Sequence, residues 1–76
     1  MQRYKNLNGD SNISSFELGN DSITIQFKEG SIYVYTYESA GMSNVETMKQ
    51  FAQSGSGLNS FIMRNARNLY ARKTKI

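Results

Sequence analysis

Three tyrosines stand at alternate positions of the chain, Tyr33, Tyr35 and Tyr37. Alternate residues of a β-strand point to the same face, so this spacing predicts a single row of aromatic rings. Such a row can stack on the unpaired bases of a single-stranded nucleic acid. The same row can instead pack into the core of a small domain, with its hydroxyl groups at the rim. The spacing alone leaves both interpretations open.

Positive charge is concentrated at the C-terminal end of the chain. The formal net charge is +3, yet residues 54–76 carry five cations and no acid. A segregated group of Arg and Lys side chains is typical of proteins that bind the phosphates of a nucleic acid. A solvated helix face followed by a frayed basic tail would give the same pattern. The five cations are Arg64, Arg67, Arg72, Lys73 and Lys75.

The sequence offers little material for catalysis or metal binding. It has no histidine and no cysteine, which removes the commonest general base, the commonest transition-metal ligand and any disulfide. The six carboxylates are scattered, and none follows the spacing of a calcium-binding loop. The Gly-Ser-Gly run 55–57 could present backbone amides to a phosphate, but a turn between helices explains it more simply. We therefore expect no enzymatic activity, no cofactor and no metal.

Three strands are expected to position the tyrosines. Residues 13–18 form a first strand, and a turn cluster of Gly, Asn and Asp follows it. Residues 22–27 alternate strictly between apolar and polar side chains, which predicts a second strand with one buried face. Residues 32–37 are β-branched or aromatic throughout, which is typical of a strand, so we expect the third strand here. Together these segments predict an antiparallel meander.

The turn between the second and third strands decides which face the tyrosines share. A two-residue turn at Glu29 and Gly30 would pair Ile25 with Val34 and point the tyrosines away from the apolar face. A three-residue loop over 28–30 would pair Ile25 with Tyr33, because one residue of slip inverts every side chain. The two-residue turn requires a positive φ at Glu29, whereas the loop requires it only at Gly30. We therefore favour the three-residue loop.

Two helices are expected after the strands. Residues 43–46, Ser-Asn-Val-Glu, have the pattern of a capping box at the start of a first helix, and the Ser-Gly-Ser-Gly run 54–57 ends it. A second helix is predicted over residues 58–71, with an apolar stripe that includes Leu69. The predicted fold class is α+β, a three-stranded antiparallel β-meander followed by two α-helices packed on one face.

The chain is long enough for one small domain. We expect an irregular N-terminal lead-in over residues 1–12, a single domain over 13–71 and a basic C-terminal tail over 72–76. No stretch approaches the roughly 20 apolar residues of a membrane span, and the first ten residues contain no apolar run of the signal-peptide type. We therefore expect a cytoplasmic protein with no membrane partner.

The order of these motifs resembles the KTSC domain, a small module found at the C-terminus of some lysyl-tRNA synthetases and alone in bacterial proteins. The likeness covers residues 11–70, and its centre is the pair Tyr33 and Tyr35. The chain departs from the family pattern after the tyrosines, where a Val-Pro pair is expected and the sequence has no proline. The resemblance implies a role in RNA binding. The matching residues are Ser11-Asn12-Ile13, Ile23, Ile25, Phe27, Gly30, Tyr33, Tyr35, Gly55, Leu58, Asn59, Ile62 and Tyr70.

The sequence thus leads to two functional hypotheses of different classes. The first is a non-catalytic nucleic-acid-binding accessory module, with RNA as its ligand, in which the five C-terminal cations contact phosphates and the three tyrosines stack on bases. The alternative is a protein-interaction or self-association module that uses the exposed sheet face. The favoured turn would place Ile32, Val34 and Thr36 on that face, which would make it apolar enough to attract a protein.

Overall fold

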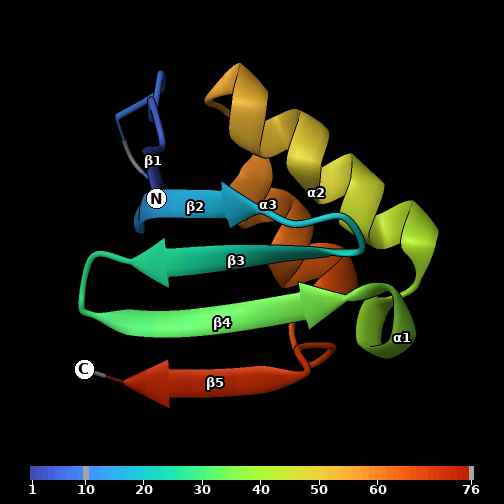
Figure 1. The fold of residues 1–76 in the computed structure, drawn as a ribbon. Coiled ribbons are helices and arrows are strands. Elements are labelled where there is room, and N and C mark those ends of the chain that lie inside the picture. The colour runs from blue at the N-terminus through green and yellow to red at the C-terminus, as the bar shows by residue number, and fades with distance from the viewer. Residues whose placement is uncertain (10, 76) are drawn as a thin grey trace.

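A computed structural model describes residues 1–9 and 11–75 and shows an α+β fold. Its strands form one antiparallel sheet in the order of the chain. In the view of Figure 1 most of the helical layer lies behind that sheet, and the first short helix lies beside the end of the fourth strand. One sheet face is therefore covered and the other is open. The strands are β1 (Gln2–Arg3), β2 (Ile13–Leu18), β3 (Ser22–Phe27), β4 (Ser31–Thr36) and β5 (Arg72–Lys75). The helices are α1 (Tyr37–Ala40), α2 (Met42–Ser54), α3 (Leu58–Phe61) and the π-helix η1 (Ile62–Ala66).

The three-residue loop between β3 and β4 is confirmed. Ile25 pairs with Tyr33 and Ile23 pairs with Tyr35. Gly30 has a φ of 105°, and its N–H donates to the carbonyl oxygen of Phe27 at 3.0 Å. Because directly paired residues of adjacent strands share a face, the tyrosines lie on the same side of the sheet as the buried isoleucines. That is the side which the helices cover.

The prediction of a three-stranded sheet was wrong, because both ends of the chain add a strand. β1 lies in the segment expected to be an irregular lead-in and pairs with β2. β5 lies in the segment expected to be a basic tail and pairs with β4. The N–H of Ala71 donates to the carbonyl oxygen of Val34 at 2.7 Å, which aligns the chain at the entry to β5. Both additions are edge strands, and an edge strand needs no buried apolar face of its own.

The helical part also differs from the prediction. The expected second helix over residues 58–71 ends at Ala66, and Leu69, which was expected in its buried stripe, is exposed. The expected capping box at Ser43 and Glu46 does not form, since α2 begins at Met42 with Gly41 as its N-cap. A capping box stands instead at the end of β4, where Thr36 and Ser39 cap the short helix α1.

The core lies between the covered sheet face and the helices. Tyr35 is the largest fully buried side chain among the described residues, with 1% of its surface exposed. Tyr4 is also buried, and its hydroxyl oxygen accepts a hydrogen bond from the N–H of Leu58 at 3.4 Å, so the N-terminal segment is tied to the start of α3. The buried apolar cluster comprises Tyr4, Ile13, Phe16, Ile23, Ile25, Tyr35, Ala40, Val45, Met48, Ala52, Leu58, Ile62 and Ala66.

Candidate nucleic-acid interface

A cavity of about 580 Å³ opens between the covered sheet face and the C-terminal part of the helical layer. Its volume lies within the usual range for small-molecule pockets, about 300 to 1,000 Å³. Strands β3, β4 and β5 supply one wall, and α3, η1 and the segment after η1 supply the other. The lining residues are Asn12, Phe27, Lys28, Glu29, Ser31, Tyr33, Tyr35, Asn59, Ile62, Met63, Arg67, Asn68, Tyr70 and Lys73.

Aromatic rings form one side of this cavity, with Tyr33 at their centre. The ring of Tyr33 meets Phe27 edge to face at a centroid distance of 5.3 Å, and Tyr70 in the same way at 5.1 Å. The ring of Tyr35 lies nearly parallel to that of Tyr33, with centroids 6.3 Å apart. Edge-to-face pairs of this kind hold aromatic rings in fixed orientations. The cavity therefore has a preformed aromatic wall.

The helical layer buries Tyr35 more completely than Tyr33. Tyr35 is fully buried, and its burial raises the pKa of the phenol above its usual range. Tyr33 is only half-buried and lies two residues nearer to the β3–β4 turn. The sequence posed a choice between a core row and an open-face row of tyrosines. The structure confirms the favoured choice, because both tyrosines lie on the covered face. Tyr35 belongs to the core, and Tyr33 packs against that core and also lines the cavity.

Three cationic side chains line the cavity beside the aromatic wall. The Lys73 Nζ lies 5.3 Å from the ring centroid of Tyr33, and a side-chain hydrogen bond with Tyr33 raises the pKa of Lys73 above its usual range. Arg67 and Lys28 line the same cavity. Glu29 is the carboxylate among the lining residues, and its Oε1 accepts a hydrogen bond from the N–H of Ser31 at 2.9 Å. The cavity thus combines aromatic rings with an excess of positive charge.

Asparagine side chains complete the polar lining. Asn12 is placed by an extension of the β2–β3 ladder, in which its carbonyl oxygen accepts from the N–H of Lys28 at 2.7 Å. Asn68 follows η1, and Asn59 lies in α3. The Oδ1 of Asn59 is buried and has no hydrogen-bond partner among the described residues. Amide groups like these can pair with the polar edges of a base.

The predicted site residues separate into those at the cavity and those elsewhere. Tyr33, Tyr35, Arg67 and Lys73 line it together, although they come from distant parts of the chain. Sequence reasoning gave no signal for Lys28 and Asn68, which also line the cavity. The KTSC resemblance includes four further lining residues without assigning them to a site, namely Asn12, Phe27, Asn59 and Tyr70.

The pairing of β5 with β4 places the basic residues of β5 on opposite faces of the sheet. Lys73 pairs with Tyr33 and therefore shares its face, whereas Arg72 pairs with Val34 and lies on the open face. Arg64 is exposed on η1 and is not among the cavity-lining residues. The backbone of Lys75 belongs to β5, but its side chain lies outside the described part of the structure. Among the four predicted phosphate-binding cations whose side chains are described, two line the cavity together, Arg67 and Lys73.

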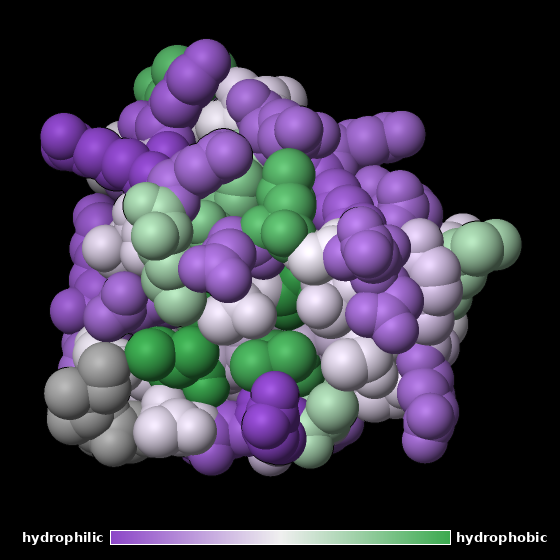
Figure 2. Space-filling model, in the orientation of Figure 1, coloured by the Kyte–Doolittle hydropathy of each residue, from purple (hydrophilic) through white to green (hydrophobic). Residues whose placement is uncertain are grey.

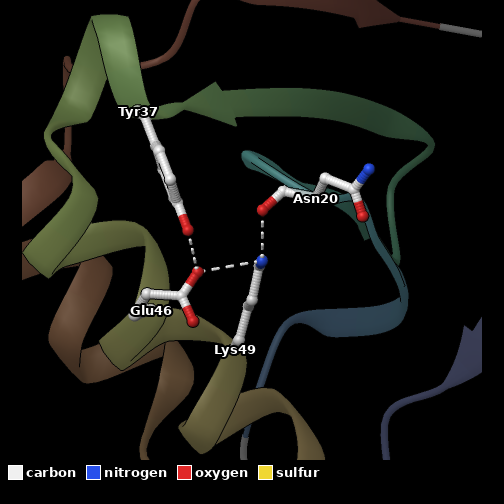
Figure 3. A network of polar contacts seen from close by, with 4 residues as sticks. All are labelled: Asn20, Tyr37, Glu46 and Lys49. Atoms are coloured by element: carbon white, nitrogen blue, oxygen red, sulfur yellow. Dashed lines mark hydrogen bonds and ion pairs between the residues drawn. The ribbon is translucent and has the colours of Figure 1, made fainter.

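Tyr37 lies at the other end of β4, where it begins α1 and takes part in a separate polar network (Figure 3). Its hydroxyl group donates to Glu46 Oε2 at 2.5 Å, and the Lys49 Nζ lies 2.9 Å from the same oxygen. Lys49 also donates to the carbonyl oxygen of Asn20 at 3.2 Å. The network joins α1, α2 and the β2–β3 turn. Tyr37 therefore has a structural partner rather than a place in the cavity.

The network predicts a pH dependence of stability. The hydrogen bond from Tyr37, followed by that from Lys49, holds the pKa of Glu46 below its usual value near 4.3. A lowered carboxylate pKa stabilises the fold above the unfolded-state pKa, and this contribution is lost as the pH falls through the folded-state value. In urea melts, we expect Glu46→Gln to weaken the decline in stability of the parent protein below about pH 4.5. The effect should be small, because the Glu46 side chain is 47% exposed.

Glu38→Gln is the matched control for this measurement, because it removes an exposed carboxylate from the neighbouring helix α1. It should leave the acid-induced decline close to that of the parent. Equal pH profiles for Glu46→Gln and Glu38→Gln would show that the Tyr37–Glu46–Lys49 network does not contribute.

The described part of the chain contains neither a metal-binding cluster nor a membrane-spanning helix. No group of three or more His, Cys, Asp or Glu side chains lies close enough together to hold a metal ion. None of the described helices has the length and apolar character that a membrane crossing requires.

Comparisons with protein-family models, curated proteins and solved structures gave no match to this chain. The resemblance to the KTSC domain therefore stays a prediction that depends on its motif residues alone.

Proposed function

We propose that the protein binds single-stranded RNA and holds one unstacked nucleotide in the cavity between the sheet and η1. The observation that carries this proposal is the position of Lys73, whose ammonium group lies 5.3 Å from the ring centroid of the half-buried Tyr33. A base-stacking surface and a phosphate-binding cation are thus adjacent, as nucleotide recognition requires. The KTSC resemblance supports RNA as the ligand.

The rings and the cations have separate parts in this proposal. The base stacks on Tyr33, and the edge-to-face contacts with Phe27 and Tyr70 hold that ring in place. Lys73 covers the ring when no ligand is bound, and its flexible four-carbon stem lets the ammonium group move to the phosphate when a base replaces it. Arg67 grips the same or the next phosphate through its guanidinium fork. Tyr35 supports Tyr33 from the core and does not itself contact the ligand.

Salt dependence provides the first test. Each phosphate contact to a single strand adds about −0.7 to the slope of log affinity against log salt concentration. Two contacts, from Arg67 and Lys73, predict a slope of about −1.4, and a third from Lys28 predicts about −2. The slope can be measured by fluorescence anisotropy of a short labelled RNA between about 50 and 200 mM salt. The absence of measurable RNA binding at the lower concentration would refute the proposal.

The open sheet face gives weaker support to the alternative, a protein-interaction or self-association module. Ile32 and Val34 lie on this face and are half-buried. Figure 2 shows hydrophobic residues there in small groups, two of them side by side, with near-neutral and hydrophilic residues around them rather than one broad patch. Scattered apolar residues are normal on a protein surface, whereas an interface usually presents a contiguous patch. For this reason we place the function in the cavity and not on the open face.

A further inference from the structure

Met63 is an apolar side chain that the proposed stacking and phosphate contacts leave without a role. It belongs to the π-helix η1 and lines the tyrosine cavity, yet 48% of its surface is exposed. Among the described lining residues of the helical wall it is the exposed aliphatic one, because Ile62 is buried. Single exposed apolar residues are common on protein surfaces. Its place on the cavity wall across from Tyr33 distinguishes Met63 from such residues.

The same π-helix supplies the cavity with a cation. Hydrogen bonds of a π-helix span one residue more than those of an α-helix, and single π-turns are frequent at functional sites. In η1, Ile62 and Ala66 belong to the buried core, whereas Met63 and the next residue after η1, Arg67, line the cavity. The wall that offers the guanidinium group of Arg67 to a phosphate therefore also offers an apolar contact to a base.

We propose that Met63 forms the second face of a base clamp, so that the base of the bound nucleotide lies between the Tyr33 ring and the Met63 thioether. This inference rests on the proposed function, because it concerns the same nucleotide. Tyr33 belongs to the sheet wall of the cavity and Met63 to the helical wall, so a base stacked on the ring turns its other face toward η1. A thioether makes favourable contacts with aromatic rings, and the unbranched side chain of methionine adapts to rings of different size.

RNA and abasic oligomers separate a base contact from a phosphate contact. Met63→Ala should weaken the binding of a short uridine oligomer about three- to tenfold, the range that a thioether–aromatic contact supplies. Its affinity for an oligomer of abasic ribose phosphates should stay at the parent value, because the cations of the cavity are unchanged. Met63→Leu keeps an apolar side chain of similar size and should retain most of the affinity for uridine.

Met42→Ala is the matched control for these measurements. Met42 is 62% exposed, lies at the start of α2 and is not among the lining residues. The substitution removes the same exposed side chain at a distance from the cavity, so it should change the affinity for neither oligomer.

Oxidation by hydrogen peroxide gives a second measurement that needs no truncation of the side chain. Peroxide transfers one oxygen atom to the thioether sulfur and leaves as water, and the sulfoxide that forms is polar. Treatment of the parent protein should lower its affinity for the uridine oligomer, because the polar sulfoxide makes a poorer face for a base. Treated Met63→Leu should bind the oligomer as it does before treatment.

The outcomes separate this inference from the proposed function. If Met63→Ala binds the uridine oligomer as tightly as the parent and Met42→Ala do, the clamp is overturned while RNA binding stands. Equal losses of affinity for the uridine and abasic oligomers in Met63→Ala would also overturn it, since that pattern reflects a changed cavity rather than a lost base contact. A peroxide effect that persists in Met63→Leu counts against it as well. If the parent binds neither oligomer, the proposed function fails and the inference fails with it.

Discussion

The Tyr35→Ala variant is expected to lose about 3 to 5 kcal/mol of folding free energy, the usual cost of truncating a buried aromatic side chain. Tyr35 is fully buried and packs against Tyr33 and Tyr70, with ring centroids 6.3 and 6.5 Å away. A domain of this length has a total stability of roughly 4 to 11 kcal/mol. A urea melt of the variant should therefore show a fold that is largely or wholly lost.

Neighbouring residues of β4 give the controls. Val34→Ala changes the opposite, open face and should cost far less, because Val34 is only half-buried there. Tyr35→Phe keeps the ring and should retain most of the stability. If Val34→Ala melted earlier than Tyr35→Ala, the core would lie on the other face and the β3–β4 register would be wrong.

The part of the fold that the sequence predicts best is the register of β3 and β4. This prediction succeeded because it depended on a local constraint, the cost of a positive φ at Glu29 compared with Gly30. The strict alternation of residues 22–27 then fixed which side chains face the helices. The α+β class and the antiparallel arrangement follow from the same local patterns.

The elements that the sequence missed are those whose stability comes from distant partners. β5 carries Arg72, Lys73 and Lys75 and has no apolar alternation, so only its pairing with β4 makes it a strand. β1 is too short to leave a pattern. The predicted capping box at Ser43 failed because α2 already begins at Met42 with Gly41 as its N-cap, which places Ser43 inside the helix. Glu46 instead accepts a hydrogen bond from the hydroxyl group of Tyr37.

The candidate site was only partly predictable for a similar reason. Composition and spacing singled out the tyrosines and the C-terminal cations as candidate site residues. Whether they meet depends on where the helical layer ends and on which face of β5 each cation occupies. The end of the predicted helix at Ala66 leaves room for the cavity, and the alternation of β5 brings Lys73 to Tyr33 while it turns Arg72 away. Neither feature is encoded in a local motif.

The position of Arg67 and Lys73 at the cavity leads to the second large expected effect, a loss of RNA affinity. In the double variant Arg67→Glu, Lys73→Glu, RNA affinity should fall about 100-fold or more, because two charged contacts of about 1.5 to 3 kcal/mol each are lost. The log–log salt slope should move from about −1.4 toward zero, since no phosphate contact remains at these positions. Circular dichroism should show an intact fold, because Lys73 and Arg67 are both exposed.

The double variant Arg64→Glu, Arg72→Glu is the matched control, because it changes the net charge by the same amount at exposed positions away from the cavity. If nonspecific attraction to a basic C-terminal end drove RNA binding, both double variants would lose affinity to the same extent. If the cavity holds the nucleotide, the control keeps most of its affinity and most of its salt slope, because long-range attraction is largely screened at about 150 mM salt. Equal losses in the two variants would therefore refute the cavity as the binding site, whereas a loss confined to Arg67 and Lys73 would locate the phosphate beside the Tyr33 ring.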